Sequence, residues 1–200
     1  RRRDSPSGSV ELENVKAVVL KLDTPGGGVA PSDLLFEELK KFRAKTNKPV
    51  VAFMDEVAAS GGVYVAMGAD YVIASPTTIT GSIGVIFQRA DLTGLIAKIG
   101  VKMPVYKSGE HKDMGSPFKD EKESAKDDEL FTKLVMDFYD RFVSVVAEGR
   151  KMRKEEVLNI ADGRIYTAKD ALSIKLIDQI GDLRAAWKKA AQLAKIDADK

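Results

Sequence analysis

Three short apolar runs in the first half of the chain have the length and β-branched composition of buried strands. They span residues 16–22, 50–54 and 71–74. Helical patterns separate these runs: an apolar face follows Ser32, which can cap a helix there, and small residues at 63–69 predict a buried helix. The face after Ser32 consists of Leu34, Leu35, Leu39 and Phe42. The alternation predicts an α/β fold with a largely parallel sheet, whose catalytic loops lie at strand ends beside helix N-termini.

The rest of the chain first shows short turn, strand and helix patterns. From about residue 120 onward its apolar residues follow helical spacing. The mixed part predicts a turn at 79–84, a strand at 85–87, a helix at 92–99 and a strand at 101–106. The later part predicts helices at 127–150, 154–161, 167–175 and 182–195. We therefore predict a polar tail at 1–13 and a single domain at 14–200. Within that domain we expect an α/β core at about 14–118 and a helical part at about 120–198.

Composition narrows the classes of protein that the chain can represent. Of its 200 residues 44% are hydrophobic and 31% charged, which is typical of a folded domain. The formal net charge is +2, without the basic excess of a nucleic-acid-binding protein. The chain has no cysteine and a single histidine, which excludes disulfides, thiol catalysis and histidine-rich metal sites. All apolar runs are strand-sized, so we expect the chain as given to be soluble.

Ser60 is the first candidate for chemistry. It precedes Gly61 and Gly62, where backbone can approach a substrate closely. A serine hydroxyl is a poor nucleophile until a base takes its proton. The simpler interpretation is that Ser60 only caps a helix. The two interpretations are compatible, because a nucleophile at a helix N-terminus also gains from the positive end of the dipole.

Three glycines at 26–28 lie between the first predicted strand and the first predicted helix. A phosphate loop is excluded, since neither Gly-x-Gly-x-x-Gly nor Gly-Lys-Ser/Thr occurs there. A flexible turn and an oxyanion hole both remain possible. In an oxyanion hole, backbone N–H groups stabilise the developing negative oxygen, and losing one donor typically costs on the order of 100-fold in rate.

Lys112 and His111 are competing candidates for the base. A lysine base must be neutral although its reference pKa is about 10.4, so it needs burial and a hydroxyl, such as that of Ser82, to hold its amine. A histidine is the commoner base, and Asp113 or Asp55 could serve as its carboxylate partner. Neighbours in an extended segment point in different directions, so only one of the two can face the serine. The residues alone favour the histidine.

Four segments, in this order, resemble the motifs of the signal peptide peptidase A (protease IV) family. They are TPGG at 24–27, AASGG at 58–62, ITGSIGV at 79–85 and KSGEHKDMGSP at 107–117. The similarity covers about residues 14–185, which is far more specific than any one motif. The resemblance implies the ClpP/crotonase type of fold, a spiral of ββα units, here followed by a helical C-terminal part.

The same resemblance implies a role for five residues. Ser60 matches the nucleophile, and Lys112 matches the general base. Gly27 matches an oxyanion donor, and Gly61 is implied as the second donor. Ser82 matches the hydroxyl that orients the lysine. The family's pattern gives the neighbouring histidine no catalytic role.

The activity implied by resemblance is that of a serine endopeptidase with a Ser-Lys dyad and no cofactor or metal. Its substrates would be cleaved signal peptides and other unfolded hydrophobic peptides. Separately from the resemblance, Val29 and Val63 are apolar and near the glycine turns, so we expect them to line the substrate groove. Members usually carry an N-terminal membrane anchor, absent from this sequence, which implies a cell-membrane location with the catalytic domain outside the cytoplasm. Short members assemble as a ring or dome, so we expect a homo-oligomer whose dyad is shared between subunits.

Two alternatives remain. One is an acyl-CoA enzyme of the crotonase type, which shares the superfold and would need a CoA pocket and usually acidic catalytic residues. The other is a non-catalytic, ring-forming scaffold that binds peptides. Neither explains the serine and lysine motifs together.

Overall fold

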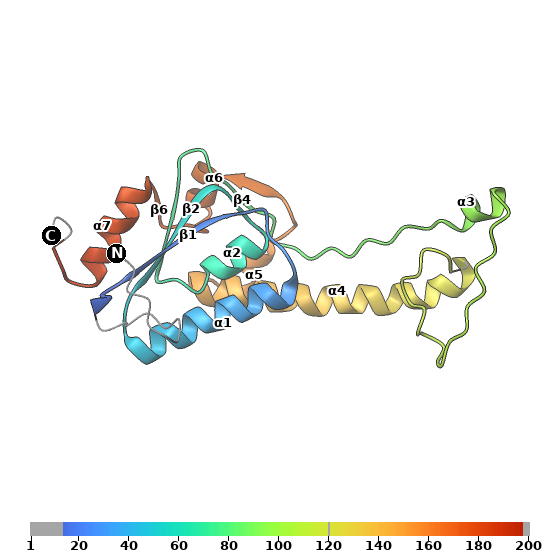
Figure 1. The fold of residues 1–200 in the computed structure, drawn as a ribbon. Helices are drawn as coiled ribbons and strands as arrows, with labels where there is room; N and C mark the ends of the chain where they lie inside the picture. Colours follow the sequence, from blue (N-terminus) through green and yellow to red (C-terminus); the bar gives the residue numbers. More distant parts are fainter. Residues whose placement is uncertain (1–13, 120, 198–200) are drawn as a thin grey trace. The chain divides into compact units, whose positions relative to one another are not determined.

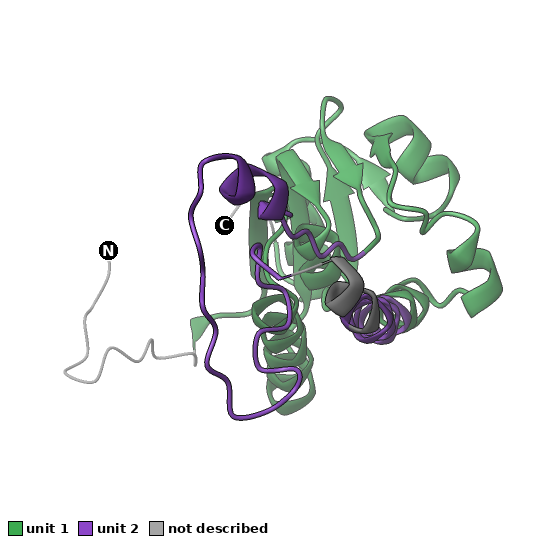
Figure 2. Cartoon of the chain, turned by 90° about the vertical axis from the view of Figure 1, so that its right-hand side faces the viewer, with its two compact units in different colours: residues 1–84, 142–200 green, residues 85–141 purple. Residues whose placement is uncertain are grey.

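The computed structural model describes residues 14–119 and 121–197 (Figure 1). They form two compact units (Figure 2). The first unit comprises the described residues up to Gly84 together with those from Phe142 onward. The second unit comprises residues 85–141. The predicted boundary near residue 119 falls inside the second unit, and the prediction of a single domain stays a prediction.

A mostly parallel sheet of six strands forms the centre of the first unit. The strands are β1 (Val18–Thr24), β2 (Val50–Ala59), β3 (Tyr71–Ala74), β4 (Ile79–Gly81), β5 (Ile165–Thr167) and β6 (Gln179–Ile180). Their order is β5-β4-β2-β3-β6, with β1 also paired to β2, and only the pair of β4 with β5 is antiparallel. The prediction of a largely parallel α/β sheet is therefore confirmed.

The long strand β2 organises this sheet. Its first half pairs with β3, its second half pairs with β4, and β1 runs along it from Val50 to Ala58. The strand begins with a run of buried apolar residues, as expected for a strand covered on both faces. It is longer than predicted, since it continues through Asp55 and Glu56 to Ala59. Ser60 follows directly.

The helices of the first unit are α1 (Val29–Thr46), α2 (Gly61–Ala66), α5 (Lys154–Leu158), α6 (Ala168–Ser173), α7 (Leu183–Leu193) and the end of α4 (Glu121–Arg150). Of these, α2 and α7 contact β1 and β2, and α6 contacts β4, β5 and β6. Val51 and Phe53 of β2 pack with Ala186 and Ala190 of α7. Because side chains alternate along a strand, Ala52 between them points to the other face. The same strand also contacts α2.

The helix α1 differs from its prediction at its start and on its buried face. It begins at Val29 after Gly28, and Ser32 does not cap it but donates a hydrogen bond from its hydroxyl to the Gly28 carbonyl, 2.9 Å away. Leu34 is exposed, whereas Phe36 is buried against Tyr64 of α2, with ring centroids 5.7 Å apart. The neighbouring helix thus selects the buried face, and not every apolar residue at helical spacing lies on it.

Asp178 ties the end of α4 to the sheet. Its carboxylate accepts hydrogen bonds from Arg150, at 2.7 and 2.9 Å, and from the Val72 N–H at 2.7 Å. The Asp178 N–H in turn donates to the Val72 carbonyl. Burial alone would raise the pKa of Asp178, but the hydrogen bonds from Arg150 and Val72 outweigh it and hold this pKa below its ordinary value.

We expect Asp178→Asn to lower the free energy of unfolding by about 2 kcal/mol at pH 7, since it leaves Arg150 without its carboxylate in a largely buried site. A lowered folded pKa means that the ionised form stabilises the fold fully above the ordinary carboxyl pKa of about 4 and less as the pH falls. Denaturant unfolding at pH 7 and pH 3 measures both effects. The exposed Asp137→Asn is the control, and a difference that persists undiminished at pH 3 would contradict the assignment.

The second unit contains α3 (Thr93–Lys98), a long irregular segment and the first part of α4. Phe87 stacks on Phe131 of α4 with ring centroids 4.1 Å apart. The strands predicted at 85–87 and 101–106 are wrong: neither segment is in a strand, and residues 101–106 are exposed. A strand needs a hydrogen-bonding partner, and in the described chain neither segment lies against one.

None of the helices built from the described residues has the length and apolar character needed to span a membrane. The longest of them, α4, carries charged residues throughout its sequence.

Candidate active site

Ser60 lies on the sharp turn that joins β2 to α2. Its backbone has φ 51° and ψ −115°, a region that side-chain-bearing residues rarely adopt. The Ser60 N–H donates to the Gly81 carbonyl at 2.8 Å, and its carbonyl accepts from the Tyr64 N–H at 3.0 Å. The hydroxyl makes no capping hydrogen bond, although Ser60 occupies the N-cap position of α2. Hydrogen bonds therefore hold the Ser60 backbone in place. The Ser60 hydroxyl does not cap α2, so it can act as a nucleophile.

The glycine turn after β1 packs directly on this serine. A methyl group added to Gly26 would lie 2.7 Å from Ser60 Cβ and 3.0 Å from the Gly61 nitrogen, and Gly26 has φ +118°. The Thr24 hydroxyl, 3.2 Å away, accepts a hydrogen bond from the Gly26 N–H and holds the turn. Only glycine fits at position 26, because both the space and the backbone angle exclude a side chain.

Gly27 and Gly61 come close together in this arrangement. A methyl group added to Gly61 would lie 3.2 Å from the Gly27 nitrogen. No acceptor for either N–H is found among residues 14–119 and 121–197. Gly61 is the first residue of α2, where an N–H has no partner within the helix. Two unpaired amides beside a serine can act as an oxyanion hole.

Gly26→Ala and Gly27→Ala form a matched pair that tests this packing. We expect the alanine at 26 to cost about 1–3 kcal/mol of unfolding free energy through backbone strain and contact with Ser60. At position 27 the added methyl group meets nothing within 4 Å, so we expect a change within about 0.5 kcal/mol. Thermal or denaturant unfolding measures both. Equal effects at the two positions would contradict the close approach of Gly26 to Ser60.

Ser82 lies beside Ser60 because their strands are neighbours. Gly81 of β4 pairs with Ala59 of β2, so the two serines follow paired residues on parallel strands about 4.8 Å apart. Ser82 also has a positive φ, 52°, and its N–H donates to the Arg164 carbonyl at 2.7 Å. The first unit thus brings together Ser60, Gly27, Gly61 and Ser82.

Lys112 belongs to the second unit. It lies in a turn, where its N–H donates to the Gly109 carbonyl at 3.2 Å, and its side chain is exposed on the single chain. The four predicted residues of the first unit and the predicted base thus belong to different units.

The histidine alternative loses the partners that the sequence suggested. His111 Nδ1 lies 3.3 Å from Asp127 Oδ1, and it pairs with neither of the two predicted carboxylates. Asp55 is paired with Lys21 at 2.6 Å, and Asp113 with Lys107 at 2.9 Å.

Comparison with known proteins decides the family. The model of peptidase family S49 matches residues 42–197. The chain belongs to peptidase family S49. This confirms the resemblance to the signal peptide peptidase A family and the prediction of a serine peptidase, and it leaves the acyl-CoA alternative without support.

Two curated relatives are similar to this S49 chain over most of its length. A protein of Enterococcus faecium, provisionally named signal peptide peptidase SppA, is 43% identical over 171 residues, which cover 86% of this chain and 49% of the relative. The chloroplastic serine protease SPPA of Arabidopsis thaliana is 39% identical over 194 residues, 95% of this chain and 28% of the relative. The chain thus spans half or less of each of these two proteins.

The fold prediction is confirmed by a solved structure. A ClpP1 point mutant from Listeria monocytogenes superimposes with a TM-score of 0.54 over 86% of this chain and 77% of that chain, at 16% identity. The S49 chain therefore has a ClpP-like fold.

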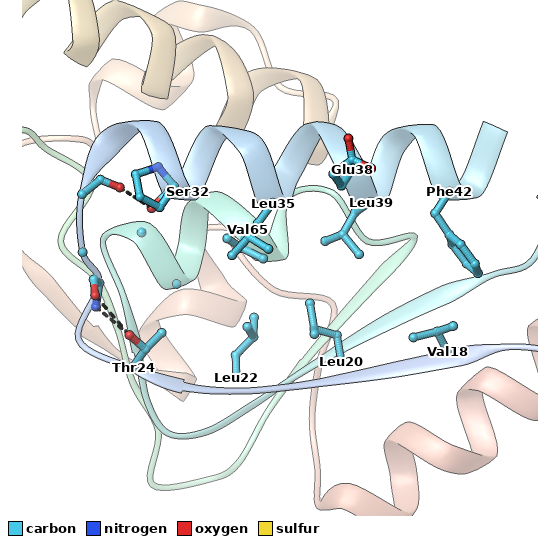
Figure 3. A pocket seen from close by; sticks show the side chains of 16 residues that line it. Val18, Leu20, Leu22, Thr24, Ser32, Leu35, Glu38, Leu39, Phe42 and Val65 are labelled. Carbon is cyan, nitrogen blue, oxygen red and sulfur yellow. Dashed lines mark hydrogen bonds between the residues drawn. The ribbon is translucent and has the colours of Figure 1, made fainter. Parts of the chain in front are cut away.

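An apolar cavity of about 610 Å³ lies between β1 and α1 and ends at the glycine turns (Figure 3). Leu20 and Leu22 line it from β1, and Leu35 and Leu39 line it from α1. The groove residues predicted from the sequence were Val29 and Val63, the apolar residues beside the glycine turns. Val63 is fully buried and Val29 half-buried, and neither lines this cavity.

Two residues near the candidate site have roles that were not predicted from the sequence. Thr24 holds the glycine turn, and a threonine two residues before a glycine is a recognisable turn signal. Ser32 lies so close that a methyl group on Gly61 would be 2.5 Å from its hydroxyl oxygen. Nothing in the sequence pattern indicates this second proximity, because the two residues are far apart along the chain.

Proposed function

We propose that this chain is the catalytic part of a serine endopeptidase with a Ser60–Lys112 dyad. Ser60 attacks the peptide carbonyl, and Lys112 takes its proton and later gives it to the leaving amine. The N–H groups of Gly27 and Gly61 stabilise the oxyanion, and the Ser82 hydroxyl holds the lysine amine. The observation that carries the proposal is the strained turn at Ser60, whose hydroxyl does not cap α2 and lies beside two amides that are unpaired within the described residues.

The exposure of the Lys112 side chain favours a site shared between two copies of the chain. Lys112 is exposed on the single chain, whereas a lysine acts as a base only where burial disfavours its charged form. Burial by a second copy would meet this requirement. We therefore propose a ring or dome in which Ser60 of one protomer meets Lys112 of the next.

The second unit has apolar surface for such a contact. Leu130, Leu134 and Phe138 are exposed at intervals of four residues along α4. Further exposed apolar side chains follow along the irregular segment: Val101, Met103, Val105 and Tyr106. Large exposed apolar patches mark interaction surfaces. Since family resemblance implies assembly with copies of the same chain, we assign these side chains to the interface between protomers.

Cleaved signal peptides and other unfolded hydrophobic peptides are the proposed substrates. The apolar cavity that ends at the glycine turns supports this choice, because it suits apolar and not charged side chains. The signal peptide peptidase name of the Enterococcus relative points the same way. We propose a site of action at a cell membrane, outside the cytoplasm, on the family resemblance alone. The reaction needs no cofactor.

Mixing two inactive variants tests the shared dyad. Ser60→Ala and Lys112→Ala proteins are dissociated, mixed in equal amounts and reassembled, and cleavage of an apolar peptide is measured. If each site takes its serine and lysine from different protomers, random assembly restores about one quarter of the wild-type sites. Each variant reassembled alone is the control. No recovery in a mixture shown to contain mixed oligomers would overturn the shared site.

A further inference from the structure

The segment that carries Lys112 is held by a network of charges. The Lys119 ammonium is 4% exposed and lies 2.7 Å from Asp127 Oδ2 and 3.2 Å from Asp113 Oδ1. Asp127, on α4, is 1% exposed. Asp113 Oδ2 also accepts a hydrogen bond from Lys107 at 2.9 Å, and His111 Nδ1 lies 3.3 Å from Asp127 Oδ1. All five side chains belong to the second unit.

This network is balanced in charge. Two lysines face two aspartates, so no charge in the buried centre is left uncompensated. The hydrogen bond from Lys119 lowers the pKa of Asp127, and the same bond raises the pKa of Lys119. Both groups therefore stay ionised at neutral pH, and the pair joins the irregular segment to α4.

Lys112 occupies a particular place in this arrangement. Its neighbours on both sides, His111 and Asp113, are tied to the network, whereas Lys112 itself makes no ion pair among the described residues. The backbone at 112 is thus fixed from both sides, and the amine is left free. A functional lysine that must reach a serine needs both properties, because a displacement of about 1 Å can cost on the order of 100-fold in rate.

We propose that Lys119 and Asp127 are positioning residues, which fix the 107–119 segment to α4 and thereby place the Lys112 amine for proton transfer. The inference rests on the proposed function for the role of Lys112. Whether or not Lys112 is the base, the network can hold the 107–119 segment on α4.

The test compares Lys119→Met and Asp127→Asn with the conservative Lys119→Arg. We expect the first two to lower kcat by about 10- to 100-fold while KM changes less than about threefold, because alignment and not binding is lost. Lys119→Arg should restore most of kcat, since the guanidinium can still pair with both carboxylates. Arg150→Met breaks a largely buried ion pair in the first unit and should leave kcat of the folded protein unchanged.

Amide hydrogen exchange provides the readout that does not depend on activity. Exchange at residues 107–119 should become faster in Lys119→Met and Asp127→Asn, with exchange around Ser60 unchanged. Unchanged exchange in the segment would overturn the proposal. Faster exchange together with a wild-type kcat would also overturn it, provided that Lys112→Ala has lost its activity. If Lys112→Ala proved fully active, the dyad would fail, and faster exchange would still support the holding of the segment.

Discussion

Ser60→Ala is expected to lower kcat/KM for an apolar peptide by roughly 10³-fold or more, because removal of a nucleophile leaves only binding and the oxyanion hole. The structure gives a reason to expect such loss without unfolding. The Ser60 hydroxyl makes no capping hydrogen bond to α2, whereas its N–H and carbonyl hold the turn. Cleavage kinetics and labelling by a serine-directed phosphonate measure the effect. The exposed Ser173→Ala on α6 is the matched control.

The backbone at Ser60 makes a second substitution informative. Since φ 51° with ψ −115° costs a non-glycine residue about 1–3 kcal/mol, Ser60→Gly should be more stable than the wild type by an amount of that order. It should also be as inactive as Ser60→Ala. A glycine variant with lowered stability would show that the turn is not strained. An alanine variant that keeps its activity would remove Ser60 from the mechanism.

Residue patterns predict three of the six strands, β1, β2 and β3, and fail where pairing decides the outcome. The strand at 71–74 has the predicted bounds, because four apolar residues between turns have no competing structure. The strands β5 and β6 were not predicted, and β4 lies in the segment 79–84 that was predicted as a turn, since two or three residues carry no periodicity. Residues 101–106 have strand-like composition and form no strand. β-propensity alone does not provide a hydrogen-bonding partner.

The residues of the candidate site were likewise predicted only in part. Motifs at 24–27, 58–62 and 79–85 mark the three turns that the parallel sheet brings to one edge, so Ser60, Gly27 and Ser82 could be selected in advance. The tie between Lys119 and Asp127 could not, because a buried lysine looks like any other in a chain with 32 basic residues. The partner of His111 was missed for a related reason: Asp127 lies 16 positions away, on a helix whose contact with the segment is tertiary.

Lys112 gives the second large effect. We expect Lys112→Met and Lys112→Arg each to lower kcat/KM by roughly 10³-fold, the arginine included, because a guanidinium cannot accept a proton from serine at neutral pH. The exposed Lys102→Met, in the same unit, should leave the rate close to wild type. Peptide cleavage and the rate of phosphonate labelling at Ser60 measure the loss in parallel.

The arginine variant separates a base from a cation at this position. If Lys112 only neutralised the oxyanion or bound a carboxylate, an arginine would preserve much of the activity. An active Lys112→Arg would therefore contradict the dyad even if Lys112→Met were inactive. His111→Ala completes the comparison: we expect a loss of less than about tenfold, since His111 is paired with Asp127 and acts at most on the loop. A loss near 10³-fold at His111, with an active arginine at 112, would transfer the role of base to the histidine.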